Sequence, residues 1–121
     1  MTKTSAPQFA IEIARITHDN KSEDVTVFDL RGISQVMDFA VICTGTSDRQ
    51  MRAVADHIQE YGRKMGEKPF GLCGVENASW IIIDYVEVVV HIFAKPYRSY
   101  YDLELLWGDA PRIEWSRSES A

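Results

Sequence analysis

The sequence is poor in cysteine and has no long hydrophobic run, and each shortage excludes a class of protein. Its two cysteines, Cys43 and Cys73, form no C-x-x-C pair, and the three histidines are scattered, so the usual spacing of a zinc site is absent. The longest apolar runs, 80–83 and 88–90, are far too short to span a bilayer. The first eight residues lack the apolar stretch of a signal peptide. We therefore expect a cytoplasmic protein with reduced thiols.

Basic charge is also in short supply. The chain has 13 lysines and arginines against 18 acidic residues, a formal net charge of -5. Proteins that bind bare nucleic acid through bulk electrostatics usually carry a basic footprint, so little direct nucleic-acid contact is expected. An acidic protein can still dock on a basic protein. With 121 residues, 45% of them hydrophobic, the chain can bury a single core without metal or disulfide support.

Hydrophobic periodicity predicts a mixture of helices and strands. Apolar residues recur at helical spacing after Ser5 and again after Ser47, and each serine is followed three positions later by glutamine, a capping-box pattern. These two patterns predict helices over residues 5–18 and 47–65. Further apolar segments predict strands over residues 25–30, 39–44, 80–84 and 87–93, and a short helix over residues 99–107.

The order of these segments predicts a mixed α/β fold, a mixed β-sheet packed with helices. Residues 68–78 contain Pro69, Gly71 and Gly74 and are expected to form a loop. Residues 1–111 are expected to form one domain. Residues 112–121 contain little apolar surface beyond Ile113 and Trp115, so they are expected to form a mobile C-terminal tail.

Two patterns suggest chemistry, but each has a simpler structural interpretation. Gly45-Thr46-Ser47 lies at a strand-to-helix junction, where backbone amides can hold a phosphate, and Asp84 lies on a later strand. The glycine and lysine spacing of a P-loop and the Asp-x-Asp pair of nucleotidyltransferases are both absent, which favours a capping role for Ser47. A nucleotide or phosphate binder remains the alternative.

His91 is the second pattern, because it lies in an apolar strand. By alternation it shares a face with Val89 and Phe93. A hydrogen-bonded structural histidine is favoured there over a base paired with Cys43. No catalytic residue, metal or cofactor is therefore expected.

Aromatic residues are concentrated in the last third of the chain, where arginine and carboxylates are interleaved with them. Tryptophan, tyrosine and arginine dominate the energetically important positions of protein interfaces. Three tyrosines in the five residues 97–101 cannot all face one core. This segment therefore favours a binding protein over an enzyme, and a dimerisation scaffold is a further alternative.

Three blocks in order resemble the ribosomal silencing factor family, RsfS or Iojap-like proteins. They are residues 38–53 (DFAVICTGTS, then RQ and Ala53), residues 80–93 (WIIIDY, then VVVHIF) and residues 98–107, which contain the YY, LE and LW pairs. Two departures stand out. Cys73-Gly74 replaces the Glu-Gly usual in the family, and Val86 replaces the glycine of its Asp-Tyr-Gly-Asp hairpin. A turn without that glycine is expected to be of another type or strained.

The resemblance implies a nucleotidyltransferase-like fold without catalytic carboxylates. It also implies a translational repressor that is not an enzyme. Such a protein binds ribosomal protein L-fourteen of the large ribosomal subunit and blocks joining of the small subunit under nutrient limitation. A role in large-subunit assembly is the family's other implied function, and a homodimer is expected when the protein is free. The contact residues implied by resemblance are Trp80, Asp84, Tyr85, Glu87, His91, Arg98, Tyr101, Glu104 and Trp107.

Overall fold

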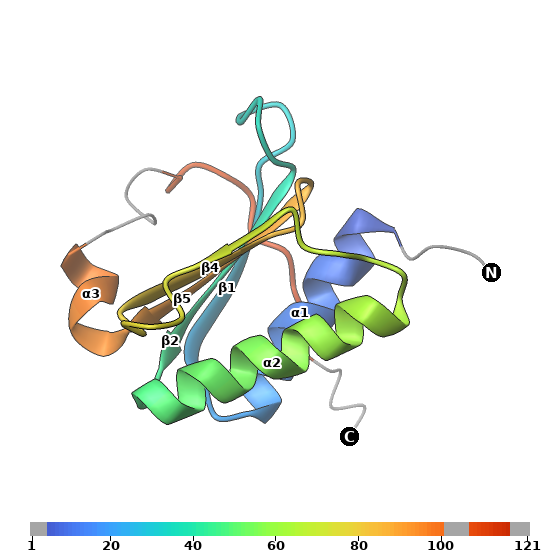
Figure 1. The fold of residues 1–121 in the computed structure, drawn as a ribbon. Coiled ribbons are helices and arrows are strands. Elements are labelled where there is room, and N and C mark those ends of the chain that lie inside the picture. The colour runs from blue at the N-terminus through green and yellow to red at the C-terminus, as the bar shows by residue number, and fades with distance from the viewer. Residues whose placement is uncertain (1–4, 101–106, 117–121) are drawn as a thin grey trace, which may run out of the picture.

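The computed structural model describes residues 5–100 and 107–116, and expectations for the remaining residues lie outside this part of the chain. The expected mixed α/β fold is confirmed, with helices packed on a five-stranded sheet (Figure 1). In chain order the elements are α1 (Ala6–Asp19), β1 (Glu23–Asp29), β2 (Phe39–Gly45), α2 (Asp48–Lys64), β3 (Gly71–Cys73), β4 (Trp80–Asp84), β5 (Val88–Ala94) and α3 (Lys95–Tyr100).

The sheet has the strand order β1-β2-β5-β4-β3. Strands β2 and β5 are parallel, with Phe39 opposite Val88 and Gly45 opposite Ala94, and every other neighbouring pair is antiparallel. The crossover through α2 therefore leads from β2 to β3 at the far edge of the sheet, and β4 and β5 then return by antiparallel pairing until β5 lies beside β2. Strand β2 is buried along its whole length and β5 along nearly all of it, which explains why both have almost continuous apolar sequences.

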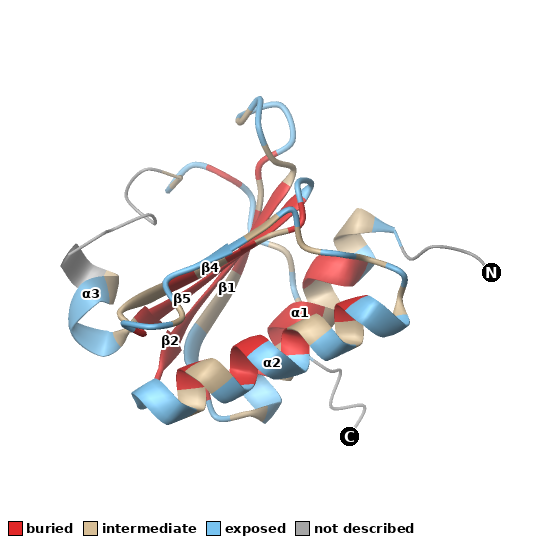
Figure 2. Cartoon of the chain, in the orientation of Figure 1, coloured by how far each residue is buried: buried red, intermediate tan, exposed pale blue. Residues whose placement is uncertain are grey.

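Helices α1 and α2 cover one face of the sheet (Figure 1). Their capping predictions are confirmed, because the Ser5 side chain accepts a hydrogen bond from the Gln8 amide and Ser47 accepts one from Gln50. Figure 2 shows that the buried stripe of each helix faces the strands. This layer contains the larger core, to which α2 contributes Met51, Val54, Ala55 and Ile58.

Two boundaries in the second half of the chain differ from expectation. The loop predicted over residues 68–78 contains the short strand β3, which pairs with β4 although glycine and proline surround it. The last helix begins at Lys95 and not at residue 99, because Pro96 lies in the first turn, where no intrahelical N–H partner is needed. The rest of the helix expected up to residue 107 falls largely outside the described residues.

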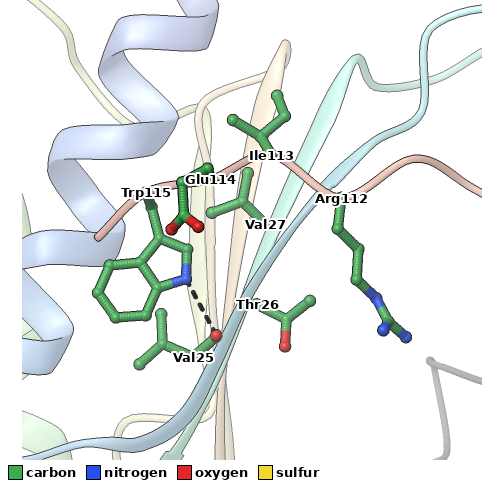
Figure 3. A pocket seen from close by; sticks show the side chains of 7 residues that line it. All are labelled: Val25, Thr26, Val27, Arg112, Ile113, Glu114 and Trp115. Atoms are coloured by element: carbon green, nitrogen blue, oxygen red, sulfur yellow. Dashed lines mark hydrogen bonds between the residues drawn. The ribbon is translucent and has the colours of Figure 1, made fainter. Parts of the chain in front are cut away.

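Residues 112–116, which were expected to belong to a mobile tail, make specific contacts with β1. The Ile113 amide donates to the Val27 carbonyl, and the Trp115 indole Nε1 donates to the Val25 carbonyl at 3.1 Å. Figure 3 shows Trp115 and Val25 joined in this way along β1. The apolar side chains of residues 113 and 115 also pack against the main core. The two residues repeat at strand spacing, so this segment lies along the free edge of β1 and covers part of it.

In the described residues no helix is both long and apolar enough to cross a membrane.

Candidate partner-binding face

The face of the sheet opposite α1 and α2 contains most of the described residues that the sequence analysis assigned to binding. Alternation along β4 and β5 places Trp80, Asp84 and His91 on this face, beside Phe93. Trp107 returns over the same face and packs against a second, smaller core that includes Phe28 and Phe93. The face is therefore formed by two strands and one later segment of the chain.

Four rings form a cluster at one end of this face. Trp80 stacks on Phe93 with 4.9 Å between ring centroids, and Trp107 meets His91 edge-on at 6.2 Å. Phe93 is fully buried, whereas Trp80 and Trp107 are half-buried and keep part of each ring at the surface. A partly exposed tryptophan held by stacking is a rigid apolar contact with little side-chain entropy left to lose on binding.

His91 is an internal, neutral member of this cluster. Its Nδ1 accepts a hydrogen bond from Trp80 Nε1 at 3.1 Å, so the ring proton lies on Nε2. Burial lowers the pKa of His91 to about 4, against a smaller opposing effect of the Asp84 carboxylate. Within the described part of the chain Nε2 has no hydrogen-bond partner. The geometry thus assigns His91 to orienting Trp80, in agreement with the structural interpretation of the sequence.

The opposite end of the face carries carboxylates. Asp84 ends β4, and its Oδ1 accepts a hydrogen bond from the Val86 amide at 2.7 Å, which closes the turn into β5. Glu87 is exposed in the same turn. Tyr85 points the other way, into the core beneath the helices, where its ring meets Phe9 edge-on at 5.0 Å. Tyr85 is buried, so the structure separates it from the other expected contact residues.

Arg98 serves an anchoring role at the far edge. Its Nη1 donates to Thr44 Oγ1 at 2.9 Å, which ties α3 to the end of β2. Nearby Tyr97 is exposed. Tyr101 and Glu104, the two remaining expected contact residues, lie outside the described residues. The structure therefore brings together Trp80, His91 and Trp107, and places Asp84 with Glu87 at a second point of the face.

The elements of a nucleotide site are not brought together. Gly45 lies opposite Ala94 at one end of the sheet, whereas Asp84 lies opposite Val89 toward the other end. Two amides around the start of α2 are also occupied, since Ser47 Oγ accepts from the Gln50 amide and Gln50 Oε1 accepts from the Thr46 amide at 3.1 Å. This arrangement supports the capping role of Ser47.

Cys43 and His91 cannot act as a nucleophile pair. Cys43 belongs to the core under the helices, while His91 lies on the other face of the sheet. Burial raises the pKa of the Cys43 thiol to about 11, which keeps it protonated and unreactive. Among the residues that the structure describes, no group of three or more His, Cys, Asp or Glu side chains could hold a metal ion.

An apolar groove that the sequence did not predict lies at the carboxylate end of this face. It has a cavity volume of about 430 Å³ and is lined by Val36, Met37, Phe70, Asp84, Val86 and Val89. Four of these side chains come from connections between elements, where hydrophobic periodicity gives no signal. The one available signal was the valine that replaces glycine at position 86 of the hairpin.

The structure shows the local backbone at both departures from the family pattern. Val86 has φ +74°, a conformation that glycine adopts freely and a β-branched residue rarely does, so the expected strain is present. Gly74 has φ +85°, and a Cβ there would clash with the Trp80 carbonyl oxygen. The glycine of the family's Glu-Gly pair is thus retained where the backbone before Trp80 requires it.

Comparisons with known proteins agree with this architecture. The family model described as "Ribosomal silencing factor during starvation" matches residues 3–121. The ribosomal silencing factor RsfS of Halalkalibacterium halodurans is 44% identical over 96 residues, covering 79% of this chain and 82% of the relative. That of Bacillus subtilis is also 44% identical, over 93 residues, covering 77% and 79%. The chloroplastic Iojap protein of Arabidopsis thaliana is 32% identical and covers 88% of this chain but 44% of its own length.

Solved structures show the same fold. A crystal structure of a protein from Chromobacterium violaceum superposes with a TM-score of 0.83, at 26% identity and 95% coverage of both chains. A Bacillus halodurans structure gives 0.76 at 38% identity, covering 88% of this chain and 98% of the other. Because the family model matches nearly the whole chain and relatives share 44% identity over most of it, this chain belongs to the ribosomal silencing factor (RsfS, Iojap-like) family.

Proposed function

We propose that this chain represses translation by binding ribosomal protein L-fourteen on the large ribosomal subunit, where its bulk prevents the small subunit from joining. The observation that carries the proposal is the pair of half-buried tryptophans, Trp80 and Trp107, which ring contacts hold on the face of the sheet opposite α1 and α2. Steric occlusion needs a rigid contact surface and no catalytic group, and this face supplies such a surface.

Charge supports a basic protein as the partner. The chain carries a net charge of -5, and Asp84 and Glu87 place two carboxylates beside the apolar part of the face. Complementary charge speeds encounter and selects against wrong partners more than it adds affinity. We therefore assign the affinity to the rings and the selectivity to the carboxylates. A cytoplasmic location and a homodimer in the free protein belong to the same proposal.

Co-sedimentation with purified large subunits tests the proposal directly. The protein is expected to travel with large subunits, and small subunits added afterwards are expected to remain separate. A protein that stays at the top of the gradient at low salt, or one that travels with large subunits without hindering joining, would contradict it.

A variant of Trp107 tests whether this residue contacts the large subunit. Trp107→Ala is expected to weaken binding by more than about 1 kcal/mol, roughly fivefold, if Trp107 is an anchor. Leu72→Ser, an exposed position on β3, is the matched control and is expected to bind normally. A folded Trp107→Ala protein with unchanged affinity would remove this residue from the contact surface.

A further inference from the structure

The apolar groove contains hydrophobic side chains that are exposed to solvent. It is lined by Val36, Met37, Phe70, Asp84, Val86 and Val89. Val36 is 77% exposed, Phe70 is 80% exposed and Val86 is 53% exposed. Single exposed apolar residues are normal on a protein surface, but contiguous ones mark interaction sites. Here three separate connections of the chain bring their exposed apolar side chains to one hollow.

Backbone hydrogen bonds hold these three connections together. The Phe70 amide donates to the Asp84 carbonyl at 2.6 Å, which fixes the segment before β3 beside the end of β4. The Asp38 amide donates to the Glu87 carbonyl at 2.9 Å, which fixes the loop before β2 beside the β4–β5 turn. Figure 1 shows the loop between β1 and β2 and the β4–β5 turn at the same end of the sheet. The groove is therefore a preformed feature and needs little ordering when it is filled.

Val86 gives a second, independent indication of function. Its φ of +74° is costly for a β-branched side chain, and glycine would relieve that cost. The strain places an isopropyl group on the wall of the groove, where it is half in solvent and adds little to the core. Backbone strain that stabilises no core contact is typical of binding sites.

The charges around the groove select its occupant. Among the described residues that line it, Asp84 is the one with a titratable side chain, and Asp38 and Glu87 are neighbours of lining residues in the chain. Of the basic residues nearby, Arg31 is bound by both oxygens of Asp29, and Lys68 is exposed two positions before Phe70. Every charged residue that lines the groove or adjoins a lining residue in the chain is thus acidic.

We propose that this groove takes a large apolar side chain of the partner protein, flanked in the partner by lysine or arginine. The inference rests on the proposed function and adds a second anchor point to it. Val89 on the groove floor and His91 beneath Trp80 are alternate residues of β5, so the groove continues the face that carries the aromatic cluster. One partner surface can therefore contact the tryptophans and the groove together.

Variants that remove only exposed apolar surface test this assignment. Phe70→Ser and Val36→Ser are both expected to fold normally, because neither side chain belongs to the core. In co-sedimentation titrations with large subunits, each is expected to bind roughly tenfold more weakly than the unaltered protein. Leu72→Ser removes a comparable exposed side chain outside the groove and is expected to change affinity less than about twofold.

The outcomes separate this inference from the proposed function. If the unaltered protein does not bind large subunits, the proposed function fails and the groove's assignment fails with it. If the unaltered protein binds and both groove variants bind large subunits as tightly as it does, the groove assignment alone is overturned. If the variants bind large subunits normally but lose self-association in sedimentation velocity, the groove joins two copies of this chain, which also overturns it.

Asp84→Asn tests the basic flank of the occupant. The amide oxygen of asparagine can still accept the hydrogen bond from the Val86 amide, so the turn is expected to persist while the charge is lost. Binding is expected to weaken about threefold at low salt and to match the unaltered protein at high salt. If Asp84→Asn and the unaltered protein bind equally well at low salt, the proposal that lysine or arginine flanks the apolar side chain of the partner is overturned.

Discussion

His91 lies between Trp80 and Trp107 in a position where an imidazolium would be desolvated. Only 6% of the residue is exposed, and Nδ1 is already occupied as an acceptor. Both observations favour the neutral ring. The orientation of Trp80, and with it the shape of the aromatic cluster, therefore depends on His91 staying unprotonated.

This dependence predicts a specific loss of stability in acid. The pKa of His91 is about 4 in the folded protein and ordinarily 6.5, so between these values the unfolded chain binds more protons. The contribution of neutral His91 to the free energy of unfolding is fully present above pH 6.5. It is lost as the pH falls toward 4, by up to about 3 kcal/mol. Denaturant unfolding of the unaltered protein and of His91→Gln across this range measures it. The variant is expected to show a shallower pH dependence, and parallel curves would refute the assignment.

Val86 predicts the opposite kind of effect, a gain in stability from removing a side chain. Glycine adopts φ +74° without the steric cost that valine carries, so Val86→Gly is expected to raise the free energy of unfolding by about 1 kcal/mol. Thermal unfolding measures the change. Val86→Ala, which keeps a Cβ at positive φ, is the control and is expected to gain little. A destabilised glycine variant would show that the valine contributes packing that its exposure does not reveal.

At the scale of elements, hydrophobic periodicity and capping motifs predicted most of the helices and strands. The helices after Ser5 and Ser47 were predictable because each has a helical period and a capping serine at its start, and β2 was predictable because it is an almost continuous apolar run. Strand β3 was not predictable, since three residues around glycine and proline form a strand only when β4 is beside them. The start of α3 was misplaced because Pro96 serves equally well as a strand end or a first helical turn.

The candidate site was likewise predictable only in part. Alternation placed His91 with Val89 and Phe93 on one face, since that depends only on strand geometry. It could not show that Tyr85, just beyond the end of β4, turns toward Phe9. The groove was hidden because its walls come from loops, whose side-chain directions are set by tertiary contacts alone.

The segment along β1 yields an element-scale prediction. Trp115 donates to Val25, its carbonyl accepts from Arg15 Nε at 2.7 Å, and its ring packs on the core. Trp115→Ala is expected to lower the free energy of unfolding by about 2 kcal/mol. Trp115→Phe, which retains the ring but loses the indole donor, is expected to lose about half as much. Denaturant unfolding distinguishes them, and a loss near zero for both would mean that the segment contributes nothing to stability.

For the whole molecule, the net charge of -5 makes the proposed binding sensitive to ionic strength. Affinity for large subunits is expected to fall severalfold between about 0.05 M and about 0.5 M salt, because rim charges are screened while the apolar anchors are not. A titration at several salt concentrations measures the slope, and it is expected to be shallow compared with that of a nucleic-acid binder. An affinity independent of salt would leave the carboxylates without a role in recognition.

The parallel pairing of β2 with β5 also has a kinetic consequence. It joins segments about fifty residues apart in the chain, whereas the antiparallel β4–β5 pair closes across a short turn. Local pairs of this kind can form early, but the seam between β2 and β5 must wait for the long loop through α2 to close. Until it does, the two most apolar strands have open edges, so the slow step of folding is also the step most exposed to aggregation.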